Sequence, residues 1–382
     1  MKSIYFATVV TFCSLYAAQP IQPLFQEQFQ LSSLQALLFT TLMMAPLSVA
    51  PLLYGFILEA ASARAMVRWA LGLLGVLELI FSLVNNYLAL LTIRGAQGLI
   101  IPAILTSIVS YISYTSEKEQ VQQNVAYYIG ATILGGFLGR FLSGIFTDLF
   151  GWRFFFFVLG LLLLCNSYLL KSMVHDAKMN YARPKLREIA LILRKRSFFF
   201  LYGCIFCLFF VFAAMMNFLP FELKKLVPGA GQSGVGFLYI GYSMGLLVSI
   251  NAKRIVSRLG NVVNAVTTGI VIFGTGCLFF LVENYLVMFG SMFVFCVGLF
   301  IAHSLLSGLL NRMATENKAI ANGLYISFYY TGGTLGSILP GLLFAEYGWR
   351  GFVMFLFCMI AVAMLLLRLM AGEAVKSGSR LF

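Results

Sequence analysis

The sequence has few charged residues, which excludes most water-soluble folds. Only 10% of its 382 residues are charged and 61% are apolar, whereas a soluble domain usually carries about 25% charged residues. The apolar residues also form long runs, and a run of about 20 residues is enough to cross a bilayer. The sequence therefore predicts a polytopic membrane protein.

Patterns of catalysis and metal binding are also scarce. There are two histidines and no H-E-x-x-H motif, and the apolar runs hold no paired acids, so an enzyme is not expected. The chain carries no G-x-x-x-x-G-K-[ST] nucleotide motor. The seven cysteines all lie in apolar runs, where cysteine is usually a small buried hydrophobe. The C-x-x-C of Cys204 and Cys207 has no partner pair, so neither a metal site nor a cofactor is predicted.

Twelve apolar runs are expected to cross the membrane as helices. The runs are unbroken rather than alternating, as in membrane helices and not as in barrel strands. Their approximate limits are 4–25, 34–58, 66–84, 87–113, 121–147, 152–171, 198–221, 233–252, 261–281, 285–310, 320–344 and 349–370.

The net charge of +13 is explained by basic residues beside the spans, without nucleic-acid binding. With a cytoplasmic N-terminus, 20 Lys and Arg residues lie on the cytoplasmic side and 4 lie outside. Cytoplasmic loops carry such an excess. We therefore expect both termini in the cytoplasm and the bacterial cytoplasmic (inner) membrane as the location.

Two windows of the sequence are nearly the same. GGFLGRFLSGIFTDLFGWRFF (135–155) and GGTLGSILPGLLFAEYGWRGF (332–352) share 10 of 21 residues at an offset of 197 positions. The same offset places Pro23 on Pro220, near the ends of spans 1 and 7. One constant offset for both pairs predicts two six-helix halves. Parallel halves of this kind hold a substrate near the bilayer midplane.

The predicted fold is therefore all-α, with twelve transmembrane helices in two pseudo-symmetric six-helix bundles. The first bundle is expected over residues 1–171 and the second over 198–382. A polar, basic segment, 172–197, joins them in the cytoplasm. The first run is not a cleaved signal peptide on this interpretation, because it completes the first bundle.

Span 4 contains RGAQG, which places Arg94 and Gln97 on one helix face. An arginine inside a span costs about 2.5–3.5 kcal/mol on insertion scales, so it should face a partner or a watery cavity. Glu78 in span 3 lies at about the same depth and is a candidate partner. A purely structural arginine is the alternative.

Small residues in spans 5 and 11 are expected to form flat helix faces that pack closely. Such a face is either ordinary close packing or a sliding gate between the halves. The glycines are Gly135, Gly136, Gly139 and Gly144, and in the second window Gly332, Gly333, Gly336 and Gly341. The Gly-Trp-Arg that ends both windows is expected to anchor a hairpin at the membrane interface.

These motifs resemble those of the major facilitator superfamily over the whole chain. RGAQG resembles the span-4 motif, whose arginine is implicated in proton coupling. The glycine face of span 5 resembles the antiporter motif, with Gly139-Arg140 replacing its usual Gly-Pro pair. YAAQPIQPLF (16–25) is similar to the first span of drug- and metabolite-efflux members. The gating signature between spans 2 and 3 is degenerate here and keeps Gly55, Glu59 and Arg64.

The resemblance implies a substrate cavity between the halves. Its candidate lining residues are Tyr16, Gln19, Gln22, Asn217, Tyr239, Tyr242, Tyr329 and Tyr330. The candidate transport and coupling residues are Arg94, Gln97, Arg140, Glu78 and His303, of which His303 can also be a hydrogen-bonded structural residue.

The resemblance also implies a function, which is proton-coupled efflux of a small amphipathic organic compound or metabolite by alternating access. Its partners would be the substrate, protons and the lipid bilayer, and the protein would act as a monomer. Arg94 and Arg140 outnumber Glu78 inside the membrane, which favours neutral or anionic cargo. An uptake symporter is the first alternative, and a channel or a membrane enzyme is the second.

Overall fold

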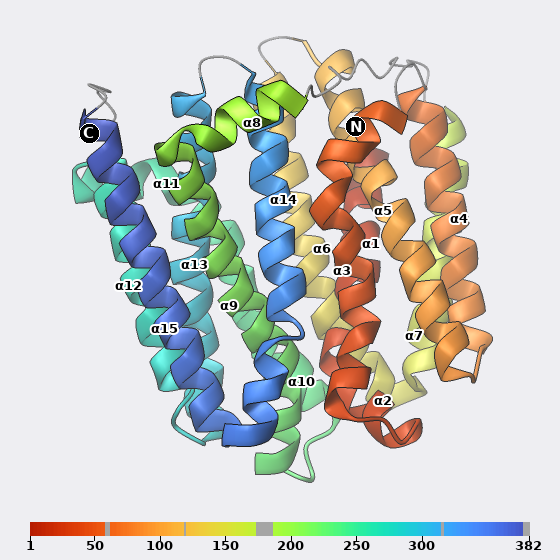
Figure 1. Cartoon of the computed structure of the whole chain (residues 1–382). Coiled ribbons are helices and arrows are strands. Elements are labelled where there is room, and N and C mark those ends of the chain that lie inside the picture. The colour runs from red at the N-terminus through yellow and green to blue at the C-terminus, as the bar shows by residue number, and fades with distance from the viewer. Residues whose placement is uncertain (58–61, 118–119, 173–185, 315–316, 377–382) are drawn as a thin grey trace. The chain divides into compact units, whose positions relative to one another are not determined.

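A computed structural model describes residues 1–57, 62–117, 120–172, 186–314 and 317–376 (Figure 1). Every regular element of these residues is a helix, which confirms the all-α prediction. The chain divides into two compact units. Unit 1 comprises Met1–Arg183 and Gly229–Tyr239, and unit 2 comprises Pro184–Pro228 and Ile240–Phe382.

Unit 1 is a bundle of long helices in which α4 packs on α5 and α7, α1 packs on α6, and α3 packs on α5 (Figure 1). A short helix that follows α9 in the chain, α10, also packs on α6. The elements of unit 1 are α1 (Lys2–Tyr16), η1 (Gln19–Ile21), α2 (Gln22–Gln28), α3 (Ser33–Ile57), α4 (Ala63–Leu83), α5 (Tyr87–Thr115), α6 (Val121–Phe150), α7 (Trp152–Leu169), η2 (Leu170–Ser172) and α10 (Gln232–Leu238).

Unit 2 is a second bundle, in which α9 packs on α14 and α15, and α12 packs on α13. Its first helix, α8, lies in the segment that the sequence presents as a polar joint. The elements are α8 (Leu186–Arg194), α9 (Arg196–Leu226), η3 (Tyr239–Ser243, whose first residue still belongs to unit 1), α11 (Met244–Leu259), α12 (Val262–Phe279), α13 (Tyr285–Met313), α14 (Lys318–Gly336) and α15 (Pro340–Lys376).

Polar caps fix where several helices begin. The side chain of Asn86 accepts a hydrogen bond from the Ala89 backbone N–H at 3.0 Å, at the start of α5. Asn284 caps α13 in the same way, accepting from Leu286 and Val287. Such a cap is worth about 1 kcal/mol, so the asparagine before each of these two apolar runs stabilises the first turn.

Three predicted spans are interrupted in the structure. The run 4–25 divides into α1, η1 and α2, and the run 233–252 divides into α10, η3 and α11. The run 320–344 is broken between Gly336 and Pro340, where α14 ends and α15 begins. Proline has no N–H to donate, so Pro340 is tolerated in the first turn of a helix and disfavoured inside one.

The repeated Gly-Trp-Arg produces the same local structure twice. Gly151 has φ +84° and Gly348 has φ +64°, a backbone conformation that favours glycine. The indole of Trp152 donates to Oε1 of Gln28 at 2.8 Å, and the indole of Trp349 donates to the Phe280 carbonyl at 2.7 Å. Each glycine turns the chain, and each tryptophan ties the turn to a neighbouring element of its own unit.

Within the described residues, eleven helical segments are long and apolar enough to cross a membrane. The helix α14 is not among them, although the predicted span 320–344 includes most of it. Lys318 begins this helix, and Asn322 and Thr331 with several glycines and tyrosines lower its hydropathy.

Candidate functional site

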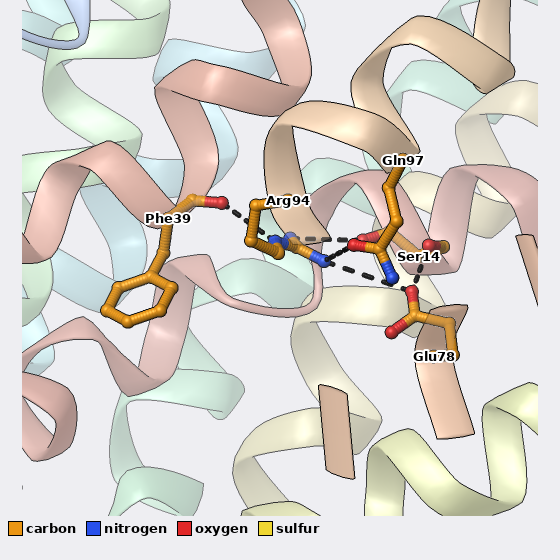
Figure 2. A network of polar contacts seen from close by, with 5 residues as sticks. All are labelled: Ser14, Phe39, Glu78, Arg94 and Gln97. Atoms are coloured by element: carbon orange, nitrogen blue, oxygen red, sulfur yellow. Dashed lines mark hydrogen bonds and ion pairs between the residues drawn. The ribbon is translucent and has the colours of Figure 1, made fainter. Parts of the chain in front are cut away.

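A buried polar network inside unit 1 is built around Arg94 (Figure 2). From α5, its Nε donates to the Phe39 carbonyl of α3 at 2.9 Å. Its Nη1 donates to Oε1 of Gln97 at 3.0 Å, and its Nη2 donates to the Ser14 carbonyl of α1 at 3.3 Å. Nη1 also lies 3.8 Å from Oε1 of Glu78 on α4, and both charged side chains are 0% exposed.

The carboxylate of Glu78 is held by more than Arg94. The Ser14 hydroxyl donates to Oε1 of Glu78, and Gln97 turns its amide nitrogen toward the same carboxylate (Figure 2). Four helices therefore meet at one ion pair. Breaking such a buried pair from one side leaves an uncompensated charge, at about 3–5 kcal/mol.

Aromatic rings surround the guanidinium of Arg94. Its central carbon lies 5.3 Å from the ring centroid of Phe81 and 5.8 Å from that of Phe156. Cation–π contacts of this kind attract a guanidinium to the face of an aromatic ring. The structure thus brings Glu78, Arg94 and Gln97 together, while their role in transport stays a prediction.

A second buried arginine, Arg140 on α6, lies among predicted cavity residues of unit 1. It is 1% exposed, and its Nε donates to Oε1 of Gln19 at 2.5 Å while its Nη1 donates to the Gly136 carbonyl at 2.7 Å. Its guanidinium carbon lies 3.9 Å from the ring centroid of Tyr16 and 5.8 Å from that of Tyr239. We call Arg140, Gln19, Tyr16 and Tyr239 the Arg140 cluster. Gln22, also a predicted cavity residue, donates to the Thr40 hydroxyl at 2.8 Å.

Three of the predicted residues of unit 2, His303, Tyr329 and Tyr330, lie together. Nδ1 of His303 lies 3.0 Å from the Tyr325 hydroxyl, and the His303 ring is 4.8 Å from the ring of Tyr329, centroid to centroid. Tyr329 stacks on Phe209 and contacts Tyr330 edge to face.

Asn217 on α9 is hydrogen-bonded to α14–α15: its amide nitrogen donates to the hydroxyl of Ser337, the residue that follows α14, at 2.9 Å. Tyr242 packs edge to face on Phe300. Within the part of the chain that the structure describes, no group of three or more His, Cys, Asp or Glu side chains could hold a metal ion.

The glycine faces allow close helix contacts inside each unit. A Cβ on Gly139 would lie 2.7 Å from the Cys13 α-carbon of α1, and one on Gly135 would lie 2.4 Å from the Val9 carbonyl oxygen. In unit 2, a Cβ on Gly336 would lie 2.2 Å from the Phe210 carbonyl oxygen of α9. Gly332 faces α9 in the same manner.

The remaining glycines of these windows have other surroundings. The carbonyl oxygen of Gly333 accepts from the Ser337 hydroxyl, and Gly341 donates to the Ile338 carbonyl at 2.9 Å. A Cβ on Gly144 would lie 2.5 Å from the Gln232 carbonyl oxygen, which places α6 directly on α10. The glycines thus support the close-packing interpretation, and Gly144 joins helices that come from the two sequence repeats.

The degenerate signature between spans 2 and 3 is only partly described. Gly55 lies in the last turn of α3, and Glu59 is outside the described residues. A guanidinium nitrogen of Arg64 donates to the Lys171 carbonyl in η2.

Asp148, at the end of α6, was not predicted from the sequence. Its Oδ1 accepts from the Gln232 N–H at 2.9 Å, and its Oδ2 accepts from the Ser233 N–H at 2.7 Å and the Ser233 hydroxyl at 2.6 Å. The sequence did contain one signal for it: Asp148 is an acid at a position where the second window has the apolar Ala345. The Phe39 carbonyl and Ser14 carried no such signal, because backbone groups and lone hydroxyls in apolar runs do not stand out.

Comparisons with known proteins agree with this architecture. The sequence profile of the Major Facilitator Superfamily matches residues 4–316. The inner membrane transport protein YnfM of Escherichia coli (strain K12) is 27% identical over 373 residues, covering 95% of this chain and 88% of that protein. An uncharacterized transporter of Buchnera aphidicola subsp. Schizaphis graminum is 25% identical over 369 residues, with 95% and 89% coverage.

A solved structure shows the same fold. It is a bacterial homolog of the human lysosomal transporter Spinster, in an inward-facing and unoccupied conformation. Its TM-score is 0.78 at 12% identity, and the match covers 97% of both chains. The profile match and this shared fold show that the chain belongs to the major facilitator superfamily. The relatives compared above are transporters.

Proposed function

We propose that the chain is a proton-coupled exporter of a small amphipathic organic compound. It would work by alternating access as a monomer in the cytoplasmic membrane, with both termini in the cytoplasm. Family membership supports transport in general. The observation that carries the choice of coupling ion is the buried ion pair of Glu78 and Arg94, with 3.8 Å between them and no exposure of either side chain.

A carboxylic acid inside a membrane protein is a candidate proton carrier. When Glu78 takes up a proton, its charge attraction for Arg94 is lost, but the bonds from Arg94 to the Phe39 and Ser14 carbonyls remain. These partners lie on α3 and α1, whereas Glu78 lies on α4. Protonation therefore changes which helices the guanidinium holds together, and a proton gradient can bias that equilibrium.

The energy available is sufficient for a useful gradient. One charge that crosses a potential of about 100 mV supplies about 2.3 kcal/mol. Because about 1.4 kcal/mol corresponds to a tenfold concentration ratio, each proton can support a roughly 50-fold substrate gradient.

The Arg140 cluster supports a preference for neutral or anionic cargo. A guanidinium pairs with a carboxylate in a two-pronged geometry, and aromatic rings stack on planar organic molecules. Arg140 lies against Tyr16 and Tyr239 and is hydrogen-bonded to Gln19. One small region of unit 1 therefore contains a guanidinium, two aromatic rings and an amide that could contact a substrate. A lipophilic cation would be repelled by the same guanidinium.

The hydrogen bonds that Asp148 accepts from α10 can hold one end of unit 1 closed. They join α6 to α10, which are separated by 84 positions in the sequence and belong to different repeats. We propose that these bonds form and break once in each transport cycle.

Purified protein in liposomes with an imposed pH gradient tests the proposal. A panel of aromatic acids, such as p-aminobenzoate, is compared with cationic dyes such as ethidium. We expect an acid from the panel to accumulate against its gradient in exchange for protons, and Glu78→Gln to abolish the pH-driven accumulation while substrate-for-substrate exchange continues. Accumulation that still follows the pH gradient in Glu78→Gln would refute the role of Glu78. Accumulation in the same direction as proton flow would favour the uptake symporter.

A further inference from the structure

The short helix α8 presents an exposed cationic and apolar surface at the start of unit 2. Ile192 is buried and packs toward α9 and α14. On its outward side, Leu186 is 85% exposed and Leu191 is 51% exposed. Arg187 and Arg194 are exposed as well. One side of α8 therefore packs on the protein, and two leucines and two arginines on the rest of the helix are exposed.

Further basic residues extend this surface. Lys195 and Arg196 are exposed directly after α8, and Arg312 and Lys318 are exposed at the end of α13 and the start of α14. A pocket between these elements is lined by Lys195 and by the apolar Ile192, Phe198, Met313 and Ala314. Glu188 also lines the pocket and is the acidic residue described on α8.

The position of α8 relative to the bilayer follows from α9. The apolar run of α9 begins at Phe198, two residues after Arg196. A membrane-spanning run enters the hydrocarbon at its first apolar residues. A helix that ends at Arg194 therefore lies at the level of the lipid headgroups. Exposed leucines suit the boundary between headgroups and acyl chains. A soluble partner would not explain why apolar side chains are exposed at this depth.

We propose that α8, with Lys195 and Arg196, binds the headgroup of an anionic phospholipid. The phosphate would lie among the arginines and Lys195, and Leu186 and Leu191 would contact the acyl chains. Basic clusters next to a membrane helix contribute about 1 kcal/mol of lipid attraction for each Lys or Arg. Zwitterionic lipid carries no net charge and would gain little of this attraction.

Native mass spectrometry of the full-length protein, extracted from phosphatidylethanolamine bilayers with increasing phosphatidylglycerol, tests the proposal. The test variant is Arg187→Gln/Arg194→Gln/Arg196→Gln. The matched control is Lys253→Gln/Arg254→Gln/Arg258→Gln, which removes three exposed basic residues at the end of α11. We expect the test variant to retain phosphatidylglycerol roughly 100-fold more weakly than the wild type, from three charges at about 1 kcal/mol each, and the control to retain it normally.

Two further arms keep the result specific. Replacing the same three arginines by lysine keeps the charge and should preserve lipid retention, while Leu191→Gln should weaken it. The proposal is wrong if the triple glutamine variant retains phosphatidylglycerol as well as the wild type, or if the α11 control loses it equally. It is also wrong if phosphatidylethanolamine is retained as tightly, or if soluble glycerol phosphate competes fully. Thermal unfolding of each variant shows whether loss of lipid reflects loss of the fold.

Discussion

Oε1 of Glu78 lies 3.8 Å from Nη1 of Arg94, and neither side chain is exposed. The two residues come from neighbouring helices, α4 and α5, and the pair is also bonded to α1 and α3. A buried pair loses more when one partner is removed than when both are, because the remaining charge stays uncompensated.

Glu78→Gln is therefore expected to lower the unfolding free energy by about 3–5 kcal/mol. The double variant Glu78→Gln/Arg94→Gln should lose less than the sum of the two single variants. Thermal unfolding in detergent, followed by circular dichroism, measures all three. As a control, Glu283→Gln breaks the exposed pair with Arg350, whose side chains are 39% and 78% exposed, and should change stability by at most about 1 kcal/mol. Additive single effects at the buried pair would contradict the coupling.

Asp148 is expected to hold α10 against α6. Asp148→Asn keeps the shape but removes the charge and one acceptor oxygen, and a hydrogen bond to a charged group contributes about 1.5–3 kcal/mol. Amide hydrogen exchange of the peptide that contains Gln232 and Ser233 should therefore become at least tenfold faster. Glu117→Gln, an exposed acid at the end of α5, serves as the control and should leave that peptide unchanged. Unaltered exchange in Asp148→Asn would show that Asp148 does not hold α10.

Gly139 is expected to tolerate no side chain. A Cβ there would lie 2.7 Å from the Cys13 α-carbon and carbonyl oxygen, and backbone atoms cannot move aside as a flexible side chain can. Gly139→Ala should lower stability by about 1–3 kcal/mol through overpacking. Gly290→Ala on α13 is the control, because a Cβ at Gly290 meets no atom within 4 Å. An unfolding midpoint for Gly139→Ala as high as that of Gly290→Ala would disprove the contact between α1 and α6.

The positions of most spans followed from the sequence, because apolar length and polar caps are local properties. Asn86 and Asn284 begin α5 and α13 where the apolar runs begin. The breaks did not follow so directly. The predicted run 320–344 continues past Pro340, whereas α14 ends at Gly336 and α15 begins at Pro340. The helix α8 was missed because its nine residues are too few to cross a bilayer and lie in a basic segment that resembles a linker. Only the tertiary packing shows that Ile192 is buried.

The candidate site was likewise only partly predictable from the sequence. Arg94, Gln97 and Glu78 were predictable because charge in a span is rare and needs a partner. The Phe39 carbonyl and the bonds of Asp148 to the α10 backbone were not, because they depend on backbone atoms brought together by tertiary packing. The sequence indicates which side chains need hydrogen-bond partners, but tertiary packing determines which backbone atoms become those partners.

The two glycines of the repeated Gly-Trp-Arg should respond alike to substitution. Gly151 has φ +84° and ψ +153°, and Gly348 has φ +64° and ψ −167°, a region that is essentially restricted to glycine. No atom lies within 4 Å of a Cβ at either position, so any destabilisation comes from the backbone and not from a clash. Gly151→Ala and Gly348→Ala should each lower the unfolding free energy by about 1–3 kcal/mol.

Gly372→Ala on α15 is the matched control for both variants. It also has no atom within 4 Å of a Cβ, but its backbone is helical, so alanine there should be neutral or stabilising by about 0.4–1 kcal/mol. Thermal unfolding of the three variants side by side measures the difference. If Gly151→Ala and Gly348→Ala unfold at the temperature of Gly372→Ala, the positive φ angles do not constrain the two turns. The repeated glycines would then need an explanation other than backbone geometry.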